Sequence, residues 1–121
     1  MVNDLNTARG ERGAGAGTYA SALLAGGQVQ GEPAPADEHE QWNGSSWSEA
    51  TEQNTDRRDY NGNGPSGDSG MIVAGYDGST SVANTEIWNG SSWTEVADVN
   101  TARYANGTIG STTDSICATG S

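Results

Sequence analysis

Bulky and polar side chains alternate along short stretches of the chain, most clearly in Thr85-Glu86-Ile87-Trp88. Successive side chains of a β-strand point to opposite faces, so Thr85 and Ile87 would share one face and Glu86 and Trp88 the other. Both faces then carry bulky groups. This pattern is typical of a strand in a sheet that lies between two neighbouring sheets, with neither face open to water.

The same stretch begins a motif that occurs twice. Residues 40–51 and 86–97 each place the sequence Asn-Gly-Ser-Ser between two tryptophans, which are Trp42 and Trp47 in one copy and Trp88 and Trp93 in the other. Asn-Gly is a strong hairpin signal because both residues tolerate positive φ. We therefore expect two hairpins in which the tryptophans face each other across neighbouring strands. Such aromatic pairs contribute roughly 0.2–1 kcal/mol over small residues.

Other segments recur at nearly the same interval as the hairpins. Asp4–Arg9 recurs as Asp98–Arg103, a weaker copy ends at Arg57, and both the hairpins and the last two arginines are 46 residues apart. Each arginine precedes a glycine-rich segment, at residues 10–17, 60–67 and 104–110. A short apolar run follows each segment, at residues 19–27, 71–75 and 116–120. Glycine-rich strands suit crowded backbones, and the apolar runs have the length of buried strands.

The repeat predicts an all-β fold made of four-stranded antiparallel units in one domain. We place the units at residues 1–51, 52–97 and 98–121, and the third stops after its second strand. Stacked repeats bury each unit against its neighbours, which explains how a chain without Phe and with 32% hydrophobic residues could form a core.

Charge narrows the range of partners. The chain has 16 acidic residues against five arginines, which gives a formal net charge of -11. A field of this sign repels phosphate backbones and anionic membranes, so we expect no nucleic-acid partner. No apolar run approaches the roughly 20 residues that a membrane span needs, and Met1–Leu5 lacks the pattern of a signal peptide, so we expect no membrane insertion. Localisation stays open on these grounds.

These recurring positions resemble kelch repeats, the units of kelch-type β-propellers. The family pattern has an arginine before the innermost strand, a glycine pair at the end of the second strand, an aromatic residue in the third and a tryptophan in the fourth. The matching positions here are Arg9, Arg57 and Arg103, Gly26, Gly27 and Gly75, Trp42 and Trp88, and Trp47 and Trp93. In the second unit we expect Tyr76 in place of the second glycine, and the third unit reads Thr119-Gly120-Ser121.

The resemblance implies a propeller segment of about two and a half blades, whereas closure usually takes about 4–8. We therefore expect an incomplete propeller that is completed by further blades, either from a longer form of the protein or from another subunit. Glu40 and Glu86, two residues before the first tryptophan of each hairpin, are expected to be structural. We predict that Glu86 pairs with an arginine or with backbone amides.

Metal chemistry finds little support in the sequence. The copper site of galactose oxidase, which lies on a kelch-type propeller, needs two histidines, tyrosines and a crosslinked cysteine, but this chain has only His39 and Cys117. His39 is interpreted as a solvated residue at a strand edge, and Cys117 as an inert core residue. Residues 59–64 resemble the start of a calcium loop but lack its final glutamate, so a glycine-rich strand is preferred. No cofactor is expected. The Asn-Gly-Ser sequons are explained as hairpin turns.

We expect a non-enzymatic binding or structural module whose partner is a protein or a glycan. Ligand contacts are expected in the two loops that differ between units, at Gln28, Glu32 and Asp37 and at Tyr76 and Asp77. Similar short units occur in phage tail-fibre and bacterial surface proteins, so a virion or an extracellular surface is the expected setting by analogy. Two alternatives stay open. One is a fragment of a propeller enzyme, of the sugar oxidase or epimerase type, with active residues outside this chain, and the other is a structural filler between subunits.

Overall fold

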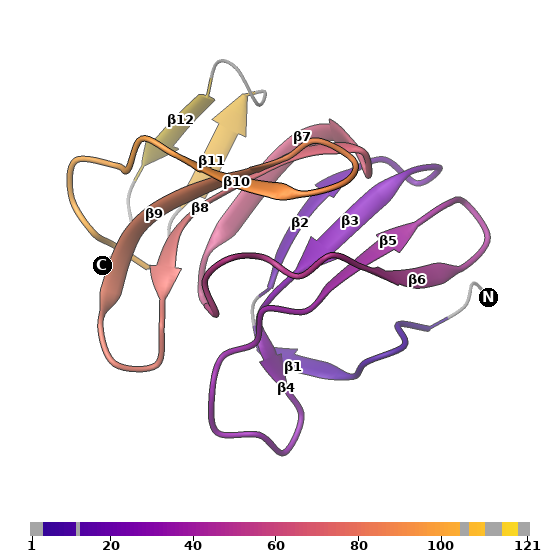
Figure 1. Ribbon diagram of the computed structural model, residues 1–121, viewed down its shortest axis with the longest axis horizontal. Coiled ribbons are helices and arrows are strands. Elements are labelled where there is room, and N and C mark those ends of the chain that lie inside the picture. The colour runs from indigo at the N-terminus through magenta and orange to yellow at the C-terminus, as the bar shows by residue number, and fades with distance from the viewer. Residues whose placement is uncertain (1–3, 12, 105–106, 111–114, 119–121) are drawn as a thin grey trace.

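The computed structural model describes residues 4–11, 13–104, 107–110 and 115–118, and all regular secondary structure among them is β-strand (Figure 1). The strands are β1 (Arg9–Glu11), β2 (Ala14–Gly17), β3 (Ala22–Ala25), β4 (Gln28–Val29), β5 (His39–Trp42), β6 (Trp47–Ala50), β7 (Asn61–Ser66), β8 (Ser69–Tyr76), β9 (Ser81–Trp88), β10 (Trp93–Val96), β11 (Gly107–Gly110) and β12 (Ser115–Ala118). The expectation of an all-β fold is confirmed. The described residues contain no helix that could span a membrane.

Two four-stranded antiparallel sheets form most of the molecule. The first sheet has the order β2-β3-β5-β6, and the second has the equivalent order β7-β8-β9-β10 (Figure 1). Strands β11 and β12 pair with each other, as do β1 and β4. Consecutive strands within each four-stranded sheet are neighbours, so the sequence order of the repeat becomes the spatial order of its strands.

The two tryptophan hairpins form as expected. Trp42 lies opposite Trp47 and Trp88 opposite Trp93, with ring centroids 5.5 and 5.4 Å apart. In the first turn the side-chain Oδ1 of Asn43 accepts hydrogen bonds of 2.9 Å from the backbone N–H groups of Ser45 and Ser46, and Gly44 has φ 97°. The second turn repeats these bonds at Asn89. The asparagine thus satisfies the turn, and the glycine permits its left-handed backbone.

The core lies between the two sheets. Ala14, Leu23 and Ala25 of the first sheet pack in one cluster with Ile72, Trp88 and Trp93 of the second. Strands β2 and β7 lie side by side (Figure 1), and a Cβ atom on Gly70 of the second sheet would lie 2.6 Å from Leu23 Cδ2. A larger residue at position 70 would therefore displace the Leu23 side chain, because the sheets approach closely.

The opposite face of the second sheet is also buried in its centre. Met71, Val73 and Ala74 form a second cluster, with Ile87 and Val99 packed against it. Register places Val73 opposite Thr85 and Met71 opposite Ile87, while Ile72 lies opposite Glu86 on the other face. Both faces of β8 and β9 are therefore covered, as the alternation of bulky side chains predicts.

The position of the glycine pair differs from the sequence interpretation. Gly26 and Gly27 both have positive φ, of 60° and 95°, and the matching residues in the second sheet are Ala74 at 60° and Gly75 at 121°. The Gly27 N–H donates to the carbonyl oxygen of Arg57 at 3.0 Å, and the Gly75 N–H donates to that of Arg103 at 2.8 Å. The first glycine is therefore replaced by Ala74, and Tyr76 lies outside the pair.

One expected loop contains a strand. Gln28 and Val29, at the start of the segment interpreted as a loop from Gln28 to Asp37, form β4 and pair with β1. The positive φ of Gly26 and Gly27 turns the chain away from the first sheet, so Gln28 and Val29 leave that sheet and pair elsewhere.

Candidate functional site

The arginine and glutamate of the second unit are structural. Arg57 and Glu86 are fully buried, and Arg57 Nη2 donates to the Glu86 carboxylate. Arg57 Nη1 donates to the carbonyl oxygens of Ala74 at 3.0 Å and Asn84 at 2.8 Å, and the Asn54 N–H donates to Glu86 Oε1 at 2.7 Å. The predicted pairing of Glu86 with an arginine is confirmed. Because the protein itself uses these groups, they are not arranged as a ligand site.

The first unit repeats the same arrangement. Arg9 Nη2 lies 3.1 Å from Glu40 Oε2, and Arg9 Nη1 donates to the carbonyl oxygens of Gly26 and Glu38 at 2.8 Å each. The Asn6 N–H donates to Glu40 Oε1 at 2.7 Å. In the third unit the backbone N–H of Arg103 donates to Val82 O at 3.3 Å, just as the Arg57 N–H donates to Ala36 O at 3.3 Å. Arg57 and Arg103 thus occupy equivalent backbone positions, and Arg9 and Arg57 make equivalent side-chain contacts.

His39 is not a solvated residue at a strand edge, as the sequence interpretation had it. Its side chain is buried between the sheets, with its ring 4.5 Å from the Trp88 ring and 5.2 Å from the Trp93 ring in edge-to-face geometry. Its Nδ1 lies 3.1 Å from the carbonyl oxygen of Thr51. Burial lowers the pKa of His39 to about 4, so the ring is neutral at pH 7. Trp88 and Trp93 of the second unit thus bury His39, which its own segment would leave exposed.

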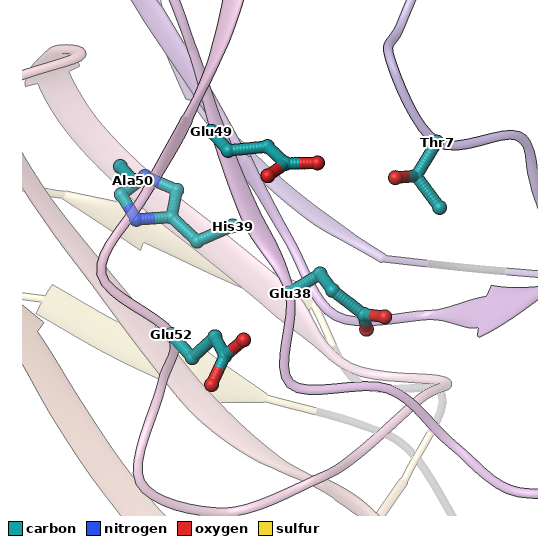
Figure 2. A pocket seen from close by; sticks show the side chains of 6 residues that line it. All are labelled: Thr7, Glu38, His39, Glu49, Ala50 and Glu52. Carbon is teal, nitrogen blue, oxygen red and sulfur yellow. The ribbon is translucent and has the colours of Figure 1, made fainter.

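A cavity of about 260 Å³ lies beside His39 (Figure 2). It is lined by Thr7, Glu38, His39, Glu49, Ala50 and Glu52. In Figure 2 the three glutamates point their carboxylates to one side, and the histidine ring turns the other way. No cluster of His, Cys, Asp or Glu in the described part of the chain is arranged to hold a metal ion. The cavity is acidic, but its histidine faces the tryptophans.

The two loops expected to bind ligand lie side by side. A Cβ atom on Gly78 would lie 3.0 Å from Pro35 Cδ, and the loops together line a cavity of about 280 Å³. Both project from the same end of the molecule, at the bottom of Figure 1, away from the tryptophan turns. Asp77 Oδ1 accepts hydrogen bonds of 2.8 Å from the N–H groups of Ser79 and Thr80, which lower the pKa of Asp77. This loop is therefore ordered by its own side chain.

Glu32 and Asp37 lie in the first of these loops. They line a further cavity of about 200 Å³, together with Val29, Pro35 and neighbouring residues. Partial burial raises the pKa of Asp37, and the nearby carboxylates of Asp56 and Glu52 raise it further. This part of the first loop carries a concentrated negative charge.

Gln28 and Tyr76 are linked through Arg58. Arg58 Nη1 donates to Gln28 Oε1, and the guanidinium carbon lies 5.6 Å from the centre of the Tyr76 ring. The backbones of Arg58 and Tyr76 also exchange two hydrogen bonds, of 3.0 and 2.9 Å. The structure therefore brings these two sequence-predicted residues together, and it does so through an arginine that the sequence interpretation did not single out.

A fourth cavity, of about 270 Å³, is lined by Arg58, Asp59, Tyr76 and Tyr104. The rings of Tyr76 and Tyr104 are 5.7 Å apart and tilted by 59°. Asp59 has φ 54°, which is uncommon for a residue other than glycine. Sequence reasoning missed Arg58 and Tyr104, and it considered Asp59 only as the start of a calcium loop. A usable signal was present, because the residue after each repeated arginine differs between units, as Gly10, Arg58 and Tyr104.

We call the surface formed by residues 28–37 and 76–81 together with Arg58, Asp59 and Tyr104 the loop end. It holds every residue expected to contact ligand, and it combines tyrosines, carboxylates and an arginine. A comparison with models of known protein families found no match, and a search of curated proteins found no similar protein. The functional argument therefore depends on the geometry of this surface.

Proposed function

We propose that the chain is a non-enzymatic binding module, built from kelch-type units of an incomplete β-propeller, and that the loop end binds its ligand. The observation that carries this proposal is that the repeated residues and the variable residues have different roles. The repeated Arg and Glu residues make the same structural contacts in both complete units, and the repeated Trp residues pair across the same hairpin, while the residues that differ between units meet at one end. Variable side chains on a fixed scaffold are typical of a binding surface.

Two features support the propeller part of the proposal. The two four-stranded sheets have the same strand order, and their glycine-rich strands β2 and β7 lie beside each other, with β11 next to β7. In a propeller the first strand of each blade lies nearest the central axis, where backbones crowd. The unit boundaries after residues 51 and 97 stay predictions, as does completion by further blades. A virion or cell surface would suit a module that recognises a glycan or a protein.

The test compares two exposed serines at opposite ends of β9. Ser79 lies in the loop before β9 and lines a cavity of the loop end, whereas Ser91 lies in the tryptophan turn after it. The labelled full chain is applied to an array of immobilised neutral and charged glycans. We expect Ser79→Lys to reduce the bound signal at least tenfold and Ser91→Lys to leave it unchanged. Equal loss in both variants, or no binding by the unaltered chain to glycans and to a matching peptide array, would overturn the proposal.

A further inference from the structure

The cavity lined by Arg58, Asp59, Tyr76 and Tyr104 has the composition of a site for one small ring. Its volume of about 270 Å³ lies just below the range of roughly 300–1,000 Å³ common for sites of drug-sized ligands. Tyr104 is 36% exposed, and its ring packs at 59° against that of Tyr76. An aromatic wall of this kind packs against the apolar face of a flat or chair-shaped ring.

The positive charge of Arg58 disfavours a cationic group on the Tyr76 ring. The Arg58 guanidinium already lies 5.6 Å from the centre of the Tyr76 ring, the position in which a cationic ligand would interact with that ring. A ligand ammonium group cannot take this position on the Tyr76 ring, because the Arg58 guanidinium occupies it.

Anions are disfavoured by a different group. The Asp59 carboxylate lines the same cavity, and its Oδ2 lies 3.8 Å from Arg58 Nε. The formal net charge of -11 adds a repulsive field for any polyanion that approaches. A neutral ligand meets neither penalty.

Hydroxyl groups fit the polar side of the cavity. A carboxylate only accepts hydrogen bonds and a guanidinium only donates them, whereas a hydroxyl group does both. Two neighbouring hydroxyl groups on one ring could donate to Asp59 and accept from Arg58, which the 3.8 Å between these side chains allows. The remaining face of the ring would lie on Tyr104.

From these contacts we infer that the cavity lined by Arg58, Asp59, Tyr76 and Tyr104 binds one neutral monosaccharide ring. Arg58 and Asp59 bond its hydroxyl groups, and Tyr104 packs on its C–H face. This inference rests on the proposed function, because it names the ligand class of the loop end. It also gives a role to the left-handed backbone of Asp59, which sets the carboxylate beside the arginine.

Saturation-transfer NMR on the full chain tests the inference with free sugars at millimolar concentration. The neutral probes are glucose, galactose, mannose and N-acetylglucosamine, and the charged probes are glucosamine and N-acetylneuraminic acid. We expect signal transfer to at least one neutral probe and to neither charged probe. Transfer to a charged probe that equals or exceeds every neutral one would overturn the inference.

Three variants locate the site. We expect Tyr104→Ser and Asp59→Asn to weaken binding of the neutral probe at least tenfold, and Asn keeps the backbone of Asp59 accessible because it tolerates positive φ. Tyr19→Ser is the matched control, because Tyr19 is 94% exposed and lies outside the cavity, and it should bind as the unaltered chain does. Unchanged binding in Tyr104→Ser and Asp59→Asn would overturn the inference. If Ser79→Lys still abolished array binding in that case, the proposed function would stand and the monosaccharide inference alone would fail. Absence of binding to every array would overturn both the proposed function and the inference.

Discussion

The two tryptophan hairpins have nearly the same sequence but different surroundings. Trp88 and Trp93 are 2% and 6% exposed, because both rings lie against the first sheet. Trp93 Nε1 also donates a 3.1 Å hydrogen bond to the carbonyl oxygen of Thr51. Trp47, the counterpart of Trp93, packs on Trp42 of its own hairpin and stays half-buried. Trp42 is 8% exposed, close to its counterpart Trp88, so the neighbouring sheet makes the larger difference to the second tryptophan of each hairpin.

The largest expected effect comes from removing one ring of each pair. Trp93→Ala leaves a cavity between two sheets and should lower the free energy of unfolding by about 3–5 kcal/mol. Trp47→Ala removes a ring that is partly in water and should cost about 1–2 kcal/mol, in proportion to its smaller buried area. Urea unfolding followed by far-ultraviolet circular dichroism measures both. Equal losses would contradict the view that the neighbouring sheet makes the difference.

A second comparison concerns the two buried glutamates. The segment 53–57 bridges both sheets, because Gln53 and Arg57 bond to the first sheet's unit while Asn54 and Arg57 bond to Glu86 in the second. The segment 4–9 reaches Glu40 and other groups of the first unit alone. Loss of the Glu86 contacts should therefore separate the two sheets, whereas loss of the Glu40 contacts should release the segment 4–9.

We expect Glu86→Gln to cost about 3 kcal/mol, because it leaves the buried Arg57 guanidinium without its counter-charge. Glu40→Gln should cost about half as much in global unfolding. It should instead speed hydrogen exchange at the amides of Asn6 and Thr7, which donate to Glu40. Exchange detected by mass spectrometry after proteolysis separates the outcomes, and a global loss in Glu40→Gln as large as that in Glu86→Gln would refute the comparison.

Local pattern predicted the parts of the fold that are decided locally. Alternation around Thr85–Trp88 and the repeated Asn-Gly turns were enough to place the strands and the tryptophan pairs. The pairing of Glu86 with an arginine followed because a carboxylate next to buried rings needs a counter-charge. In each case the necessary information lies within one unit and is repeated in another.

The errors concern contacts made between units. His39 stands between two glutamates, so its own segment reads as polar, and only the rings of Trp88 and Trp93 bury it. Ala74 adopts a backbone normally taken by glycine, which shifted the apparent position of the glycine pair. Tyr104 meets Tyr76 because consecutive units pack together. No local pattern of hydrophobic residues encodes this meeting.

The smallest expected effect is the pH dependence caused by His39. The pKa of His39 is lowered from 6.5 to about 4, chiefly by burial and in part by the nearby Arg9 charge, while the Thr51 carbonyl and the Glu40 carboxylate oppose the shift. The folded protein therefore keeps the ring neutral between pH 6.5 and pH 4, while the unfolded chain takes up a proton in that range. Stability is fully present above pH 6.5 and is lost as the pH falls. A difference of about 2.5 pKa units corresponds to a loss of at most about 3 kcal/mol.

His39 is the single histidine of the sequence, so its ring signals in a proton NMR titration are unambiguous. We expect them to stay in the neutral position down to about pH 4.5. Carboxylates titrate over the same range, so the control is His39→Gln, which cannot take up this proton. Between pH 7 and pH 4 the unaltered chain should lose about 3 kcal/mol more stability in urea than His39→Gln does. An ordinary ring pKa near 6.5, or parallel losses in the two proteins, would show that the tryptophans of the second hairpin do not seal His39 from water, and the contrast between the two hairpins would lose its main evidence.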